Sequence, residues 1–294
     1  MRLIPRLQAA FPRLLLEKDF SFSRHTAIGC GGSAEAAASP SSYIEAARLL
    51  AFLERGSIPY CLLGAGANVL PSDGRFEGVV VRFSRLGQLR ITDEHILAGA
   101  GVTGGRLLAA AQKAGVGGLS PFSGIPMTVG GGTAMNAGVR DLHFSDVVQA
   151  VLCAEKGKIG FLRGEACRFR EKSSLFSEEK IAVLAVLLRG RRARSEDIAR
   201  ESCYYRSLRA RLPKGRSMGC TFVNPEGVSA GALIEACGLK GARAGGAVVS
   251  DRHANFILSE NGRAADVAAL IELIRTIVQK KTGILLREEI RRIP

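Results

Sequence analysis

Glycine residues are unusually dense between residues 99 and 138, and this feature constrains the fold more than any other. The chain of 294 residues contains 35 glycines, above the ~7% that is usual in proteins. Glycine lets main-chain N–H and C=O groups approach a ligand or a neighbouring segment closely. The stretch therefore predicts either a binding site built largely from main chain or a bend packed tightly against its surroundings.

The charge balance favours anionic ligands. Lysine and arginine number 41 and aspartate and glutamate 27, which gives a net charge of +14. Such a surface attracts nucleic acids, anionic lipids or phosphorylated small molecules. Tryptophan is absent and aromatic residues make up only 6% of the chain, which argues against base stacking on single-stranded nucleic acid. With 47% hydrophobic residues the chain is not disordered, so we expect a globular binder of small anions and no nucleic-acid partner.

The cysteines and the N-terminal region exclude several classes of protein. Seven cysteines without C-x-x-C spacing disfavour a zinc site and a disulfide framework, so no metal is expected. The N-terminal region is interrupted by Pro5 and Pro12 and is a poor signal peptide. No apolar stretch approaches the ~18 residues of a membrane span. We expect a cytoplasmic protein, monomeric and without a membrane partner.

The hydrophobic pattern predicts an α+β chain. A helix is expected over 41–56, where Ser42 and Glu45 form a capping pair and Ile44, Ala47 and Ala51 share the apolar face. Further helices are expected over about 105–114, 229–238 and 266–281, the last ending at a glycine. Strands are expected at 79–81, 147–153, 181–190 and 254–258. The charged stretch 189–214 is typical of a domain boundary or a linker helix.

A short glycine loop at residues 64–68 follows an apolar run at 60–63. Successive N–H groups without obstructing side chains can form a concave site for a pyrophosphate. The loop is not a Rossmann fingerprint, because Val69 stands where the third glycine would fall, and no Gly-Lys-Ser/Thr follows as in a Walker A loop. The alternative is an ordinary tight turn.

A second segment, residues 123–138, combines glycines with the neutral hydrogen-bonding residues Ser123, Thr128 and Asn136. It contains almost no charge. A flat, uncharged heterocycle bound through main-chain groups would suit it. The alternative is a glycine-rich bend that packs closely against a neighbour.

Taken in order, these segments resemble the UDP-N-acetylenolpyruvoylglucosamine reductases (UDP-N-acetylmuramate dehydrogenases), flavoenzymes that complete UDP-N-acetylmuramate. The resemblance rests on four blocks, at 25–32, 63–79, 123–147 and 217–256, and extends from about residue 25 to the C-terminus. The Gly-Ile-Pro core at 124–126 and the Asn-Pro pair at 224–225 make it specific. The short run between Cys237 and His253 resembles the shorter type, which lacks a tyrosine-bearing substrate loop.

The resemblance implies a vanillyl-alcohol-oxidase-type (PCMH-type) FAD-binding fold of two α+β subdomains, followed by an α+β substrate-binding domain. The expected ranges are an N-terminal segment at 1–24, an FAD-binding domain at 25–190 with subdomains at about 25–85 and 86–190, a linker at 191–214 and a substrate domain at 215–294. The implied reaction uses FAD and NADPH and acts on a UDP-sugar in peptidoglycan precursor synthesis. A hydride reaches the enolpyruvyl methylene, so the protein must stabilise the carboxylate and supply a proton.

The resemblance also assigns the catalytic residues. Cys220 takes the position of the family's proton donor, usually serine and sometimes cysteine, and thiols release protons far more readily than hydroxyls. Glu289 takes the position of the family's C-terminal carboxylate. The alternatives are an inert buried cysteine that packs as a small hydrophobic residue, and a surface glutamate in a charged tail.

The chain departs from the family pattern in one block. Lys172 stands where the family has an arginine that clamps the intermediate, and Glu171 stands where it has a tyrosine. Lysine keeps the charge but loses the planar two-pronged donor. Either Lys172 acts as a point charge, or Arg168 or Arg170 replaces it; an impaired enzyme is a further alternative.

The remaining candidates follow the matching blocks. The expected substrate-binding residues are Glu171, Asn224, Lys240 and His253, although His253 could equally anchor the next strand. The expected cofactor-binding residues are Gly64, Ala65, Gly66, Ala67, Asn68, Val69, Ser123, Gly124, Ile125, Pro126, Thr128, Val129, Gly130, Asn136, Ala137 and Gly138. Two rival functions remain open: another oxidoreductase of the same FAD fold, and a basic nucleic-acid-binding protein.

Overall fold

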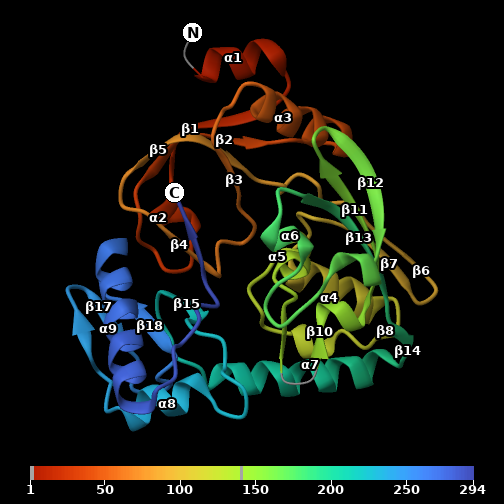
Figure 1. Cartoon of the computed structure of the whole chain (residues 1–294). Helices are drawn as coiled ribbons and strands as arrows, with labels where there is room; N and C mark the ends of the chain where they lie inside the picture. The colour runs from red at the N-terminus through yellow and green to blue at the C-terminus, as the bar shows by residue number, and fades with distance from the viewer. Residues whose placement is uncertain (1–2, 140–141) are drawn as a thin grey trace. The chain divides into compact units, whose positions relative to one another are not determined.

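The computed structural model describes residues 3–139 and 142–294 (Figure 1). Two compact units share the chain, one from the described parts of 1–18, 36–65 and 78–210, the other from 19–35, 66–77 and 211–294. The units alternate along the sequence, whereas contiguous domains were expected. The functional assignment of the expected ranges stays a prediction, and residues 1–2 and 140–141 of those ranges lie outside the described residues. Helices and strands are mixed throughout, which confirms the α+β class.

The largest sheet lies in the first unit and has five strands in the order β12-β11-β13-β7-β6. All neighbouring strands in it are antiparallel. The strands are β6 (Leu89–Thr92), β7 (His95–Gly99), β11 (Val148–Glu155), β12 (Lys158–Arg163) and β13 (Ala182–Arg189). The β-branched runs at 147–153 and 181–190 are therefore strands as predicted, and they occupy adjacent central positions.

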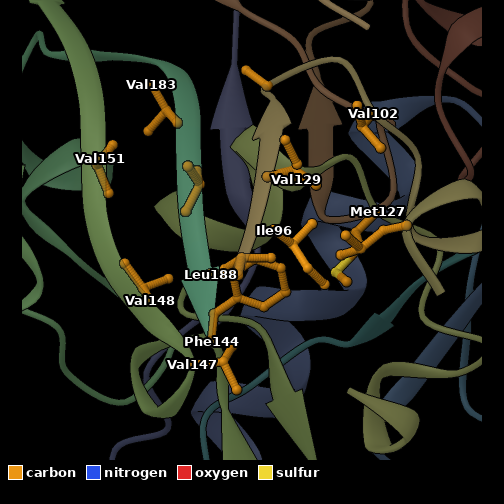
Figure 2. Packing of buried hydrophobic residues seen from close by; sticks show 14 of the residues in the cluster. Ile96, Val102, Met127, Val129, Phe144, Val147, Val148, Val151, Val183 and Leu188 are labelled. Carbon is orange, nitrogen blue, oxygen red and sulfur yellow. The ribbon is translucent and has the colours of Figure 1, made fainter. Parts of the chain in front are cut away.

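The glycine-rich stretch packs on this sheet. It contains α4 (Gly104–Lys113), β8 (Val116–Gly117), the 3₁₀ turn η1 (Ser120–Phe122) and α5 (Val129–Ala134). Its few apolar side chains are buried in one core with those of the strands, including Val102, Leu107, Phe122 and Val129. Figure 2 shows part of this core, with Ile96 of β7 and Phe144 close to Leu188 of β13. Glycine thus gives close approach while a sparse set of apolar residues fixes the stretch in place.

A four-stranded sheet has the order β1-β2-β5-β3, with β3 parallel to β5. Its strands are β1 (Leu15–Ser21), β2 (Ser33–Ser39), β3 (Tyr60–Leu62) and β5 (Arg75–Val81). The second core of the first unit joins Val79 and Val81 to helix α3 (Tyr43–Arg55) and to Leu7 of α1 (Leu3–Ala10). The N-terminal region therefore contributes to this core.

Helix α3 begins as expected but buries a different face. Ser42 accepts a hydrogen bond from the Glu45 N–H, and Gly56 follows the last turn. The predicted apolar face was wrong at Ile44, whose side chain is 66% exposed. Ile44 lies in the first turn, and the buried face instead consists of Ala46, Ala47, Leu49, Leu50 and Leu53.

Short elements complete the first unit, and the charged stretch 189–214 contains a helix, α7 (Ser195–Ala210), as the sequence suggested. The others are β9 (Gly138–Val139), β10 (Leu142–His143), η2 (Phe144–Asp146), η3 (Gly164–Cys167), α6 (Leu175–Glu178) and β14 (Arg191–Arg192).

The second unit contains an antiparallel sheet, β15-β18-β17-β16, with one long helix packed on it and a shorter helix packed against that helix (Figure 1). The elements are α2 (Phe22–His25), β4 (Val69–Pro71), β15 (Ser217–Cys220), α8 (Ala230–Ala236), β16 (Arg243–Ala244), β17 (Ala247–Val249), β18 (Phe256–Ser259), α9 (Ala264–Thr282) and β19 (Arg291–Ile293). Helix α9 matches the predicted 266–281 helix and buries its apolar stripe against β16 and β17. Gly283 ends it with a φ of 75°.

Candidate active site

The two glycine segments expected to bind a cofactor meet in the first unit. Strand β3 ends at Leu62, and the loop that follows brings Gly64 against Thr128. A Cβ at Gly64 would lie 2.9 Å from the Thr128 hydroxyl oxygen, so only glycine fits there. That hydroxyl in turn accepts from the Gly131 N–H over 3.2 Å and caps α5.

Several main-chain groups of the second segment, residues 123–138, already form hydrogen bonds within the protein. The N–H groups of Val129 and Gly130 donate to the carbonyls of Val102 and Ala100, and the Met127 carbonyl accepts from Gly104. Gly130 also lies so close to Ala100 that an added Cβ would be 2.8 Å from its methyl carbon. These groups tie the segment to residues 100–104 and are engaged within the protein. The role of Val129 and Gly130 in cofactor binding stays a prediction.

Ser123 offers a different hydrogen-bonding group. It is 2% exposed, and its hydroxyl oxygen is buried without a hydrogen-bond partner in the described part of the protein. Ser120, one turn earlier in η1, has the same property and is fully buried. A buried hydroxyl without a partner is costly, so each of these groups is suited to pairing with a ligand.

A tight turn places Lys172 against the end of the second segment. Arg170 and Ser173 exchange main-chain hydrogen bonds across the turn, and Lys172 has a φ of 56°. The Lys172 ammonium approaches the Gly138 carbonyl at 3.4 Å. The Asn136 side chain is used within the protein, donating to the Arg170 carbonyl and accepting from the Ser145 N–H. Asn136 therefore holds the turn, and with it Lys172, against residues 136–138.

One of the two alternatives to Lys172 is engaged elsewhere. Arg168 forms an ion pair with Glu179 at the protein surface. Glu171, at the tip of the turn, is exposed. Lys172, by contrast, contacts the end of the predicted cofactor segment at the Gly138 carbonyl.

Residues 66–69 of the first loop belong to the second unit. Gly66 has a φ of 67°, and its Cα lies so near the main chain of His25 and Thr26 that a Cβ would be 2.3 Å from the His25 carbonyl oxygen. The Gly66 carbonyl accepts from the Ala27 N–H over 2.9 Å. Any side chain at position 66 would separate the loop from residues 25–32, the first block that resembles the family.

Cys220 is the last residue of β15 and is partly exposed. It follows Gly219, whose φ is 79° and whose missing side chain faces open space. The next residue, Thr221, is 1% exposed and its hydroxyl has no hydrogen-bond partner among the described residues. Cys220 thus lies between a glycine that adjoins open space and a third buried hydroxyl suited to a ligand.

Glu289 is held beside Cys220 in the same unit. Its N–H donates to the Thr221 carbonyl over 2.8 Å, and its carbonyl accepts from the Asn68 side chain over 3.2 Å. Phe222 forms an antiparallel bridge with Glu288. The two predicted catalytic residues of this unit therefore lie on directly paired chain segments, and the cofactor loop touches the second of them.

The predicted substrate-binding residues of this unit have local partners. Asn224 accepts from the Ala230 N–H at the start of α8, and Lys240 forms an ion pair with Glu235 over 2.6 Å. The His253 ring packs on Phe256, and its Nδ1 faces the Asn255 N–H at 3.3 Å. Burial lowers the pKa of His253 below its ordinary value. The predicted role of all three in substrate binding stays a prediction.

Comparison with known proteins identifies the family. Residues 211–293 match the profile described as UDP-N-acetylenolpyruvoylglucosamine reductase, C-terminal domain, and residues 34–159 match an FAD binding domain. The reductase of Geobacter metallireducens is 36% identical over 98% of this chain and 97% of its own length. The chain belongs to the UDP-N-acetylenolpyruvoylglucosamine reductase family. The resemblance read from the motifs is confirmed.

Other members of the reductase family agree. The reductase of Anaeromyxobacter is 37% identical over 93% of this chain and 87% of its own length. The crystal structure of the Thermus caldophilus reductase superposes with a TM-score of 0.81 at 31% identity, covering 96% of this chain and 99% of that one. The expected fold, an FAD-binding domain followed by the family's C-terminal domain, is confirmed, and the protein is an FAD-dependent oxidoreductase.

The residues present fit FAD. The FAD-binding range contains the Gly64–Thr128 approach and the partnerless hydroxyls of Ser120 and Ser123. The approach keeps side chains away from the main chain of the loop, and the two hydroxyls retain hydrogen-bonding capacity for a bound group. Over 3–139 and 142–294, no cluster of His, Cys, Asp or Glu could hold a metal ion, and no helix is long and apolar enough to cross a membrane.

Sequence reasoning did not select three buried polar residues that adjoin predicted site residues in the two units. Ser120 and Thr221 carry buried hydroxyls without partners, and Asn255 is 2% exposed and bonds the main chain next to Cys220. In the sequence, only their positions near the predicted residues Ser123, Cys220 and His253 could have pointed to them. Their burial and contacts come from chain segments far away in the sequence.

Proposed function

We propose that this chain catalyses the NADPH-dependent reduction of UDP-N-acetylglucosamine enolpyruvate to UDP-N-acetylmuramate, a step in peptidoglycan precursor synthesis. The observation that carries the proposal is the direct pairing of the Cys220 and Glu289 segments through the Thr221 carbonyl. This pairing supports a site in which the Cys220 thiol supplies the proton and the Glu289 carboxyl acts on the same substrate, as reduction of an enolpyruvyl ether requires. The substrate is the one named by relatives that match along nearly the whole chain.

FAD, when bound and reduced by NADPH, supplies the hydride that the enolpyruvyl methylene carbon accepts. Ser123 and Gly64 would hold this cofactor together with the other predicted residues of 64–69 and 123–138. The chain's own task is then to stabilise the negative charge that develops on the substrate carboxylate and to protonate the neighbouring carbon.

Cys220 holds the proton for that carbon on Sγ. Its place at the end of β15 fixes the Cα while Gly219 leaves the adjoining space open. Transfer of the proton to the carbon that carries the ether oxygen completes the lactyl group and leaves a thiolate, which solvent reprotonates. The step needs no other acid.

Glu289 and Lys172 act on the developing charge. In its protonated form the Glu289 carboxyl donates a hydrogen bond to the substrate carboxylate, where the charge accumulates. The Lys172 ammonium is the predicted counter-charge and replaces the planar clamp of an arginine with a point charge. Asn224, Lys240 and His253 are proposed to contact the uridine diphosphate.

The proposal includes a cytoplasmic monomer. The +14 charge favours capture of NADPH and the UDP-sugar, both of which carry several negative charges. Size-exclusion chromatography with light scattering tests the oligomeric state, and a dimer mass would contradict it.

The function is tested by anaerobic mixing. The purified protein, loaded with FAD, is expected to lose its visible flavin absorbance on adding NADPH and to regain it on adding the enolpyruvyl UDP-sugar. Bleaching without recovery would favour another oxidoreductase of the same fold. A protein that takes up no FAD would overturn the proposal.

A further inference from the structure

The Asn68 side chain reaches from the predicted cofactor loop to the main chain of Glu289. Its amide Nδ2 donates to the Glu289 carbonyl over 3.2 Å. The Glu289 N–H donates to Thr221 over 2.8 Å. Both main-chain groups of Glu289 are therefore engaged, one by the segment that follows Cys220 and the other by the loop.

The same loop continues into a ladder with the C-terminal strand. Strands β4 and β19 pair in parallel, with Val69 opposite Arg291 and Pro71 opposite Ile293. The Arg291 N–H donates to the Asn68 carbonyl over 2.9 Å, and the Ser72 N–H donates to the Ile293 carbonyl over 3.0 Å. Asn68 lies at the start of this strand pairing and contacts the C-terminal segment through both its main-chain carbonyl and its side-chain amide.

We infer that Asn68 is a positioning residue for the reduction: its side chain acts through Glu289 and sets the place of that carboxyl. The inference rests on the proposed function, in which Glu289 stabilises the developing charge. A side chain can only be as well placed as the peptide that carries it. A displacement of ~1 Å at a reacting group can cost about 100-fold in rate.

The arrangement also couples the cofactor loop to the carboxyl. Residues 66–69 are predicted to lie at the FAD pyrophosphate, and residue 68 of the same loop fixes Glu289. A ligand that orders the loop will therefore also order residues 289–293, and by reciprocity a firmly docked C-terminal strand will favour the ligand.

The test uses Asn68→Ala in the full-length protein. The variant keeps the carbonyl that accepts from Arg291 and loses only the side-chain amide. At saturating FAD, recovery of flavin absorbance with the enolpyruvyl UDP-sugar is expected to slow about 10- to 100-fold, whereas bleaching by NADPH stays within about threefold. The Kd for FAD is expected to rise, because the docked C-terminal strand favours the ligand. A purely structural role would not separate the two half-reactions in this way.

A second readout needs no cofactor. In the protein freed of FAD, hydrogen exchange of the amides in residues 289–293 is expected to be faster in Asn68→Ala than in wild type. Adding FAD is expected to slow this exchange in the wild type more than in the variant. Unchanged exchange in the variant would overturn the inference whatever the activity.

Arg292→Ala is the matched control in the same strand. It removes the ion pairs from Arg292 to Glu288 and Glu272 but leaves the main-chain contacts of Glu289 in place. Both half-reactions are expected to remain near wild type. If Arg292→Ala slows flavin recovery as much as Asn68→Ala, or if Asn68→Ala slows both half-reactions equally at saturating FAD, the inference fails.

Failure of the proposed function would look different. In that case the wild-type flavin would not be reoxidised by the enolpyruvyl UDP-sugar at all, and no variant would be needed to see it.

Discussion

The side-chain amide of Asn255 pairs with both main-chain groups of Phe222. Its Oδ1 accepts from the Phe222 N–H over 2.9 Å, and its Nδ2 donates to the Phe222 carbonyl over 2.8 Å. The Asn255 carbonyl also accepts from the Thr221 N–H. One buried residue thus extends the pairing of β15 beyond Cys220 and fixes the segment on which Glu289 docks.

Asn255→Ala is expected to destabilise the protein substantially. The substitution leaves a buried N–H and a buried C=O unpaired at Phe222, at roughly 1–3 kcal/mol for each group. Urea unfolding followed by circular dichroism measures the loss. Asn224→Ala is the matched control, because the exposed Asn224 makes one capping contact worth about 1 kcal/mol. Equal losses in the two variants would contradict the assignment.

The elements predicted correctly are those with a strong local pattern. Helix α9 has an apolar stripe over several turns and a glycine stop, and β11 and β13 are long β-branched runs. Strand β2 was missed because its sequence is rich in alanine, which favours helices, and its place comes from pairing with β5. The assignment of 19–35 and 66–77 to the second unit depends on long-range contacts that leave no local signal.

Some residues of the candidate site could likewise be predicted from the sequence, and others could not. Cys220, Glu289 and Lys172 were selected because they occupy the family's positions, and their chemistry could be argued from residue type. Asn255 could not be selected, because its partner lies 33 residues away and an asparagine before a strand has no distinctive pattern. The hydrogen bonds of the Val129 and Gly130 N–H groups could not be predicted either. A glycine-rich sequence is compatible both with tight packing and with ligand binding.

Cys220→Ala is expected to slow the second half-reaction selectively. Removing a general acid costs about 100- to 10,000-fold, so flavin recovery with the enolpyruvyl UDP-sugar should fall by this factor. Bleaching by NADPH needs no proton from Cys220 and should change less than about threefold. Anaerobic stopped-flow spectroscopy resolves the two steps.

Two further variants test whether the loss in Cys220→Ala comes from the missing proton donor. Cys220→Ser is expected to recover part of the rate, because a hydroxyl can still donate a proton. Cys203→Ala, at an exposed cysteine of α7, should match wild type. Selective loss in Cys203→Ala, or none in Cys220→Ala, would show that another group supplies the proton.

Lys172 is expected to tolerate arginine but not alanine. Loss of a charged hydrogen bond to the substrate carboxylate is worth ~1.5–3 kcal/mol, so Lys172→Ala should lower kcat/KM for the enolpyruvyl UDP-sugar about 10- to 100-fold. Lys172→Arg keeps the charge and should retain most of the activity. Lys158→Ala, at an exposed lysine of β12, controls for the change in net charge. Wild-type kinetics in Lys172→Ala would remove this residue from the proposed mechanism.

The stability of the protein is expected to fall in acid partly through His253. Burial lowers the pKa of His253 below its ordinary value of 6.5, so the unfolded chain binds the proton more readily than the folded one. The contribution is fully present above pH 6.5 and is lost as the pH falls from there through the lower folded-state pKa. Protonation of Nδ1 would also end its acceptance of the Asn255 N–H. Urea unfolding of the wild type and His253→Gln, from pH about 7.5 to about 5.5, should show a steeper decline in the wild type. Parallel declines would mean that His253 titrates alike in both states.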